Sequence, residues 1–184
     1  MIKKMQVYNI IYNKVLKHSA LILLTAAFLF ASCEKDSRNE KEITGEICFY
    51  LLKSYKTRES SMEIIKGSAR IADKPIIGYK DIISYNTILN VYTISKSARD
   101  TVICLTSSLT GQPFAVTVDK EIIYTGYFWP VTSPVECDWI HIDPLFIDFW
   151  DGLKVIPADD SEQSNPANNT DLIEILRRDK KMAD

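Results

Sequence analysis

Residues 112–130 constrain the fold of this chain most, because they hold two short runs in which apolar side chains alternate with others. The first run covers residues 114–118 and the second residues 122–126, and the polar pair Asp119-Lys120 interrupts them. Alternation with a period of two on both sides of a short polar break is typical of a β-hairpin. Asp tolerates the positive φ angle of a tight turn, but Lys stands where Gly is usual, which leaves the turn type open.

Segments outside this hairpin predict further strands. Residues 45–53 are apolar on both faces, which favours a strand in the interior of a sheet. Further extended segments are expected at residues 62–71, 76–77, 81–85, 89–94 and 138–143. Residues 145–150 (LFIDFW) are strongly apolar and fit either a last strand or a short covering helix.

Two helices are expected. The first covers residues 96–108: Ser95 can accept a hydrogen bond from a free amide of the first turn, apolar residues recur at helical spacing, and Gly111 stands where a C-cap belongs. The second covers residues 171–182, where acids in the first turn and bases in the last complement the helix dipole. A mostly antiparallel sheet with one packed helix and a C-terminal helix is a small α+β fold.

The composition divides the chain into five segments. We expect a signal peptide at residues 1–32, a flexible tether at 33–43, the α+β domain at 44–158, a polar linker at 159–169 and the C-terminal helix at 170–184. The tether is nearly all charged or polar and has too little apolar area to offset the entropy of ordering it. The domain segment is long enough for one small core but not for two.

The first 32 residues have the composition of a secretory signal. Four lysines and no acids precede the apolar run 20–31 (ALILLTAAFLFA), and Ser32-Cys33 closes it. A basic start, an apolar core of about 7–15 residues and small residues at the end are typical of a signal peptide. A membrane span would need about 20 apolar residues.

The end of this signal, Phe30-Ala31-Ser32-Cys33, resembles the lipobox of bacterial lipoproteins, in which small residues precede a lipid-bearing cysteine. The resemblance implies that Cys33 is acylated, becomes the first residue of the mature chain and attaches it to a membrane. Stable membrane anchoring requires more than one lipid signal, and several lipid chains on one cysteine meet this requirement. Phe30 stands where Leu, Val or Ile is usual, and an ordinary secreted protein cut near Ala31 is the alternative.

Two wider resemblances concern location and fold. The chain resembles small lipoproteins of unknown function from Bacteroidetes, which implies an outer-membrane lipoprotein of the cell envelope, either periplasmic or surface-exposed. Glu34-Lys35-Asp36 resembles the export signal of such proteins. Residues 81–127 resemble the P1 head subdomain of the protein-export subunit SecD, although Asp119-Lys120 replaces Asp-Gly. This second resemblance implies a strand, a helix and a strand pair, and no activity.

The charge of the chain argues against a nucleic-acid partner. Loss of residues 1–32 removes four of the 22 basic residues and no acid, so the net charge changes from −2 to −6. A surface with this excess of acids repels the phosphates of nucleic acids.

Cysteine and histidine offer only weak candidates for chemistry. Cys48, Cys104 and Cys137 allow one disulfide in three pairings, and three small buried hydrophobes are the simpler interpretation. Cys137 and His141 are four residues apart, which on a straight strand separates them by about 13 Å, too far for a metal site or a nucleophile–base pair unless the chain bends. We therefore assign no catalytic residue, metal or cofactor.

The aromatic residues are the best remaining indication of function. Tyr127, Phe128 and Trp129 end the hairpin before Pro130, where they could form an exposed platform for a sugar, peptide or protein. Core packing is the alternative.

We expect a lipid-anchored, non-enzymatic binding or interaction module of the cell envelope. Its partners would be the membrane, through lipidated Cys33, and a protein, peptide or glycan. One alternative is an envelope hydrolase or thiol-dependent enzyme that uses Cys137 and His141. The other is a purely structural envelope component.

Overall fold

The predicted hairpin is present in the computed structural model as strands β5 (Gln112–Val118) and β6 (Glu121–Phe128). The turn residues Asp119 and Lys120 have φ angles of 48° and 71°, and positive φ at both positions defines the type I′ turn whose twist matches that of a hairpin. The Oδ1 atom of Asp119 also accepts the backbone N–H of Glu46 at 3.0 Å. The turn is thereby tied to the segment that leads into the first strand.

The structure describes residues 44–107, 110–158, 165 and 168–183. The predicted signal peptide (1–32) and the predicted tether (33–43), including Cys33, lie outside these residues, as does most of the predicted linker (159–169). In the part that is described, no helix has the length and apolar character needed to cross a membrane.

Nine strands of the described residues form one sheet in the order β2-β1-β5-β6-β7-β8-β4-β3-β9. Besides the hairpin, the strands are β1 (Ile47–Ser54), β2 (Arg70–Ile71), β3 (Ile82–Asn86), β4 (Val91–Ile94), β7 (His141–Ile142), β8 (Leu153–Ile156) and β9 (Met182–Ala183). Only the pairs β6–β7 and β3–β9 are parallel among these strands. The predicted α+β class with a mostly antiparallel sheet is confirmed.

Helix α2 (Lys96–Ile103) begins as predicted and ends early. The Ser95 hydroxyl accepts the N–H of Ala98 at 3.3 Å and caps the helix. The chain then tightens into the 3₁₀ segment η3 (Cys104–Ser107), which follows the β-branched pair at the helix end. Gly111 is therefore not the C-cap. Glycine is required at this position for a different reason. Its φ angle is 73°, and a Cβ there would lie 2.3 Å from an atom of the Trp129 ring.

Helix α3 (Thr170–Arg178) packs into the same core as the sheet. The Asn169 side chain caps it by accepting the N–H of Leu172 at 3.0 Å. The prediction that the helix continues to residue 182 is wrong, because Lys180 has a φ angle of 56° and redirects the chain into β9. Leu172, Ile175 and Leu176 are fully buried in the main core.

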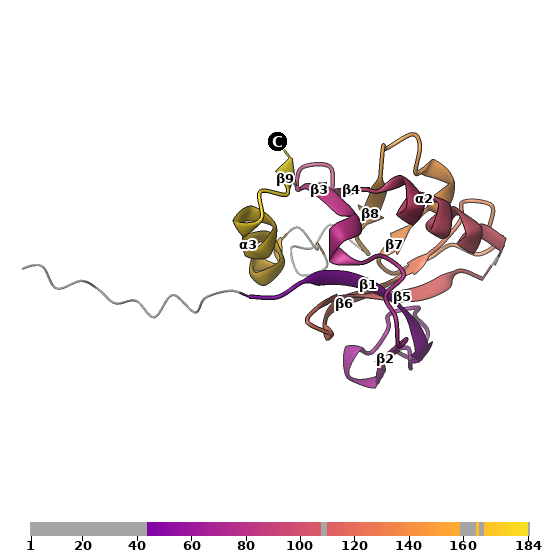
Figure 1. Ribbon diagram of the computed structural model, residues 1–184. Helices are drawn as coiled ribbons and strands as arrows, with labels where there is room; N and C mark the ends of the chain where they lie inside the picture. Colours follow the sequence, from indigo (N-terminus) through magenta and orange to yellow (C-terminus); the bar gives the residue numbers. More distant parts are fainter. Residues whose placement is uncertain (1–43, 108–109, 159–164, 166–167, 184) are drawn as a thin grey trace, which may run out of the picture. The chain divides into compact units, whose positions relative to one another are not determined.

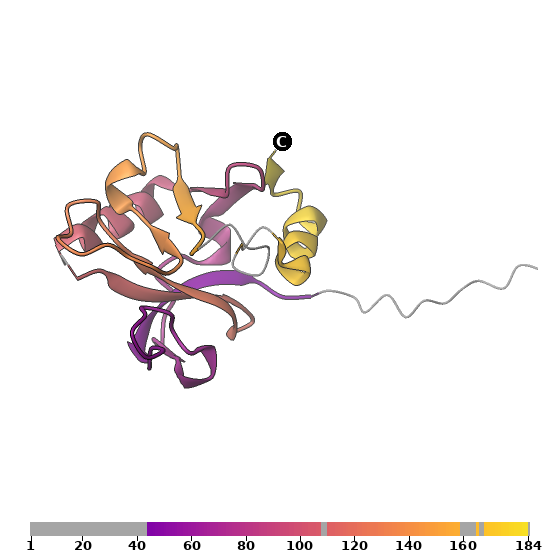
Figure 2. The same cartoon turned by 180° about the vertical axis from the view of Figure 1, so that it is seen from behind.

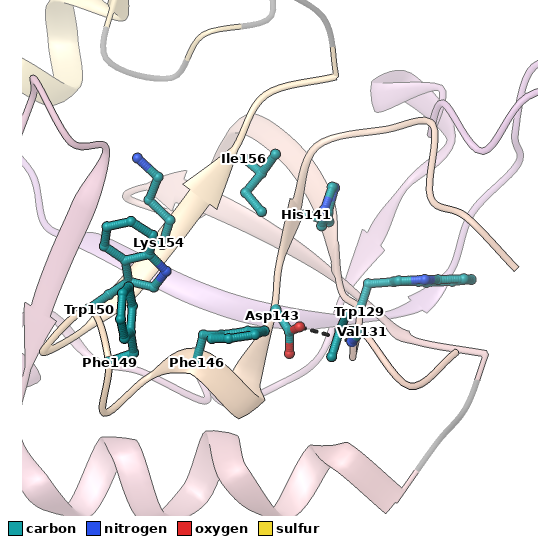
Figure 3. A pocket seen from close by; sticks show the side chains of 9 residues that line it. All are labelled: Trp129, Val131, His141, Asp143, Phe146, Phe149, Trp150, Lys154 and Ile156. Carbon is teal, nitrogen blue, oxygen red and sulfur yellow. Dashed lines mark hydrogen bonds between the residues drawn. The ribbon is translucent and has the colours of Figure 1, made fainter. Parts of the chain in front are cut away.

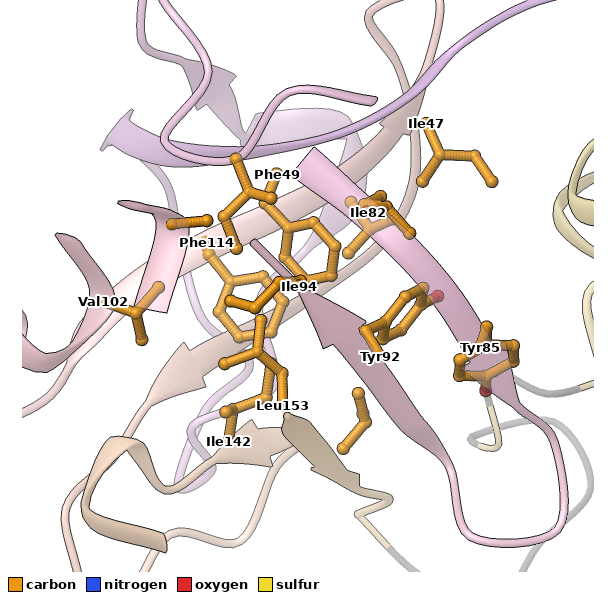
Figure 4. Close-up of a cluster of buried hydrophobic side chains, with 14 of the residues drawn as sticks. Ile47, Phe49, Ile82, Tyr85, Tyr92, Ile94, Val102, Phe114, Ile142 and Leu153 are labelled. Atoms are coloured by element: carbon orange, nitrogen blue, oxygen red, sulfur yellow. The ribbon is translucent and has the colours of Figure 1, made fainter. Parts of the chain in front are cut away.

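The core lies between two groups of strands. Figures 1 and 2 show β1, β5 and β6 on one side of it and β3 and β4 on the other, with α2 and α3 near opposite ends. Figure 4 shows side chains from both groups meeting in between. The rings of Phe49 and Tyr92 contact edge to face across this core, with centroids 5.2 Å apart.

Three segments differ from their predictions, and of residues 138–143 only β7 (His141–Ile142) is a strand. Residues 62–71 form mostly loop and the 3₁₀ turn η1 (Lys66–Ser68), and only β2 at their end is a strand. Residues 145–150 form neither a strand nor a covering helix, because the 3₁₀ turn η4 (Pro144–Phe146) leads into irregular turns. Strand β8, which was not predicted, follows them and lies between β7 and β4.

Candidate functional site

The predicted platform of Tyr127, Phe128 and Trp129 is not exposed. These residues retain 3%, 1% and 7% of their accessible surface, because Phe128 packs in the main core and Tyr127 and Trp129 pack in a second cluster with Ile64 and Ala69. The Tyr127 hydroxyl donates to the Met62 carbonyl at 3.1 Å and the Trp129 indole to the Val135 carbonyl at 3.0 Å. Their polar atoms are thus satisfied inside the fold, and the prediction of an exposed platform is wrong.

Three exposed aromatic side chains lie instead on the segment after β7. Phe146, Phe149 and Trp150 are all exposed, Phe149 to 74%. Their rings form a chain of edge-to-face contacts, with centroids 6.3 Å apart for Phe146–Phe149 and 4.9 Å apart for Phe149–Trp150. Ile147 lies between Phe146 and Phe149 in the sequence. It is only 2% exposed and anchors the segment in the core.

These rings border a hollow of about 340 Å³. Its lining comes from η4 and the turns after it, from β7 and β8, and from the end of β6 and the loop that follows it (Figure 3). The lining residues are Trp129, Val131, His141, Asp143, Phe146, Phe149, Trp150, Lys154 and Ile156. We call this site the aromatic groove.

Asp143 fixes two walls of the aromatic groove to each other. Its Oδ1 atom accepts the N–H of Leu145 at 2.9 Å and caps η4. Its Oδ2 atom accepts the N–H of Val131 at 2.8 Å, in the loop that follows β6 (Figure 3). Both carboxylate oxygens are therefore engaged by the protein itself.

A second contact fixes the far end of the ring-bearing segment. The Arg99 guanidinium of α2 donates through Nη2 to the Asp151 carbonyl at 2.8 Å and to its carboxylate at 2.6 Å. Gly152 follows, and a Cβ there would lie 2.3 Å from the Tyr92 carbonyl oxygen, so only glycine allows this close approach. The rings are thus carried by a segment that is held at both ends.

Lys154 is the cation of the aromatic groove. Its ammonium lies 5.1 Å from the centroid of the Trp150 ring and donates to the Leu89 carbonyl. Burial lowers the pKa of this lysine, because removal from water disfavours the charged form.

His141 faces the groove, and one of its two ring nitrogens already forms a hydrogen bond within the protein. Its Nδ1 atom lies 2.9 Å from the Trp139 carbonyl oxygen. A carbonyl can only accept, so Nδ1 carries the hydrogen and Nε2 is the acceptor of the neutral ring.

Cys137 and His141 lie close together, contrary to the straight-strand estimate. The Cys137 thiol donates to the same Trp139 carbonyl at 3.5 Å. Because each group contacts one oxygen, at 3.5 and 2.9 Å, Sγ and Nδ1 cannot be more than about 6.4 Å apart. The chain bends before β7, and both residues line a second hollow of about 320 Å³ that shares Trp129, Val131 and His141 with the aromatic groove.

The proximity of these two residues does not create an activated thiol. Burial raises the pKa of the Cys137 thiol to about 11, so the thiol stays protonated near neutral pH. Nδ1 of His141 donates to the carbonyl and is not a base toward the sulfur.

The other cysteines and the metal-ligating side chains of the described residues do not gather in one site. Cys48 and Cys137 are half-buried and Cys104 is exposed, so the prediction of three buried cysteines is wrong. No group of three or more His, Cys, Asp and Glu side chains gathers as a metal site in the described residues.

Sequence reasoning missed the exposed rings because LFIDFW is as apolar as a core strand. Two local signals mark it as a short turn region: Asp143-Pro144, a cap followed by proline at the first helical position, and Asp151-Gly152, a turn dipeptide.

Comparison of the chain with protein-family models, curated proteins and solved structures finds no match. The resemblances to lipoproteins and to SecD remain predictions from the sequence.

Proposed function

We propose that this chain is a lipid-anchored protein of the cell envelope that binds its ligand in the aromatic groove without transforming it. The observation that carries the proposal is the groove itself, a hollow of about 340 Å³ bordered by exposed aromatic rings. This volume falls within the range of small-molecule sites, which combine apolar walls with a few polar groups.

The exposure of the rings supports binding over a purely structural role. A phenyl ring that is 74% exposed, as Phe149 is, leaves apolar area in water. Its burial against a ligand contributes up to about 1.5–3 kcal/mol. The buried Ile147 and the contacts of Asp143 and Asp151 hold the rings in place before binding, so little ordering entropy opposes it.

The anchor would be Cys33, at the outer membrane and on either its periplasmic or its surface side. Eleven residues, 33–43, separate this cysteine from the start of the described residues. Even a fully extended chain of this length spans no more than about 40 Å. A groove on this domain would therefore sample ligands close to the membrane surface.

The anchor is tested by intact mass and membrane partitioning of the native protein beside a Cys33→Ala variant. We expect the native protein to carry the added lipid mass and to partition with membranes, and the variant to do neither. A native protein without lipid mass would refute the lipid anchor but would not affect the proposal that the aromatic groove binds a ligand.

The groove is tested with N-phenyl-1-naphthylamine, a neutral dye whose fluorescence rises in apolar surroundings. Residues 33–184 with Cys33→Ala serve as the soluble chain, since they include the whole compact unit Glu42–Asp184 and its core. Loss of one aromatic wall by Phe149→Ala should weaken binding roughly tenfold or more. The matched control is Ile83→Ala, which removes an apolar side chain that is 56% exposed and outside the groove. Equal effects of the two variants would refute the groove as the binding site.

A further inference from the structure

We infer that the ligand of the aromatic groove is a small organic anion, with an aromatic or branched apolar body and one acidic group held beside Lys154. This inference rests on the proposed function and adds the chemistry of the ligand. It follows from which polar groups of the groove already have hydrogen-bond or ion-pair partners within the protein and which do not.

Lys154, Ile156 and His141 lie in a row along one wall of the aromatic groove. Lys154 and Ile156 are two residues apart on β8 and so face the same side of the sheet. His141 on β7 is the cross-strand partner of Ile156. Figure 3 shows these three side chains along the side of the groove that faces Phe146, Phe149 and Trp150. A ligand lying between the two walls meets apolar surface on both and an ammonium at one end.

The ammonium of Lys154 lacks a carboxylate partner. Among the described residues no acidic oxygen lies within 4 Å of it, since the ion pairs are formed by other side chains. The only carboxylate that lines the groove belongs to Asp143, and its two oxygens already accept backbone N–H groups at 2.9 and 2.8 Å. Among the described residues, no acidic side chain therefore neutralises the positive charge at this end of the groove.

The position of this charge is fixed. The Leu89 carbonyl and the Trp150 ring both contact the ammonium, and a lysine ammonium has three hydrogens to donate. One donor remains for a ligand even after contacts to both. Since partial burial weakens its hydration, pairing with an anion is more favourable here than at an exposed lysine.

The size of the hollow favours a small ligand over a long chain. About 340 Å³ accommodates a body of one or two fused rings. The rings of Phe149 and Trp150 are nearly perpendicular, at 89°, and so do not form the flat platform on which a row of sugars stacks. An aromatic or branched apolar body fits such a walled hollow.

The test compares two dyes that share one aromatic body. 1-Anilinonaphthalene-8-sulfonate carries a sulfonate, and N-phenyl-1-naphthylamine lacks it. We expect the soluble chain to bind the sulfonate roughly tenfold more tightly than the neutral dye, the size of one charge-assisted hydrogen bond. Lys154→Met should abolish this preference, Lys154→Arg should retain it, and Lys80→Met, which removes an exposed charge outside the groove, should leave it unchanged.

The outcomes separate the two proposals. If the chain binds both dyes equally and Lys154→Met changes nothing, the anion inference is overturned while the groove stands. If neither dye binds, both proposals fail. A preference for the sulfonate that Lys80→Met removes as well as Lys154→Met reflects net charge alone and also overturns the inference. Near-UV circular dichroism of each variant confirms that the compared chains are folded.

Discussion

Asp143 offers a direct measure of how firmly the walls of the aromatic groove are joined. We expect Asp143→Ala to lower the free energy of unfolding by about 3 kcal/mol. The value follows from two hydrogen bonds, to the N–H groups of Leu145 and Val131 at 2.9 and 2.8 Å. Each bond to a charged acceptor contributes about 1.5–3 kcal/mol, and we take the lower end because the carboxylate is only half-buried.

The assay is urea unfolding followed by far-UV circular dichroism and tryptophan fluorescence. The matched control is Asp148→Ala, an exposed acid of the same segment. Its loss should change stability by less than about 0.5 kcal/mol. Asp143→Asn keeps one acceptor oxygen and should fall between the alanine variant and the native chain. If Asp143→Ala unfolds within 0.5 kcal/mol of the native chain, the two bonds do not hold the walls together and the reasoning fails.

Two further predictions concern the C-terminal helix and the buried thiol. Leu176→Ala should cost about 2–5 kcal/mol, because the side chain is fully buried in the main core. The exposed Arg177→Ala serves as its control, and an unchanged urea midpoint for Leu176→Ala would mean that α3 is not part of the cooperative fold. Alkylation of Cys137 by iodoacetamide should be slow at pH 8 and accelerate up to about pH 11, as its raised pKa requires. Peptide mass mapping measures this rate beside that of the exposed Cys104, and fast labelling of Cys137 at pH 8 would contradict the burial argument.

The elements that the sequence predicts correctly are those whose determinants are close together in the chain. The hairpin needs only alternation and a turn residue that accepts positive φ, which Asp119 supplies. The start of α2 needs only a cap, which Ser95 provides. Each of these causes acts within a few residues, so a local pattern is sufficient to find it.

The features that were missed depend on a distant partner or on an irregular bend. Strand β9 has two residues and exists because Tyr85 and Asn86 on β3 pair with it in parallel. The approach of Cys137 to His141 depends on a bend that lets both contact one carbonyl oxygen. The partner of β9 is distant in the sequence, whereas the bend before β7 is local but not periodic, so neither leaves a periodic signal.

The aromatic groove is itself a consequence of a short strand. Strand β7 pairs through only two residues with β6 on one side and with β8 on the other. Beyond these pairs the chain on either side of β7 leaves the sheet, as the loop after β6 and as η4 with its turns (Figure 3). A longer β7 would keep both segments in the ladder, and the side chains of LFIDFW would then alternate between the two faces of the sheet. Because the ladder stops, only Ile147 enters the core, and the rings of Phe146, Phe149 and Trp150 are left around the hollow. The hollow is thus created where regular pairing ends, and the hydrogen bonds of Asp143 and Arg99 supply the rigidity that the missing ladder would have given.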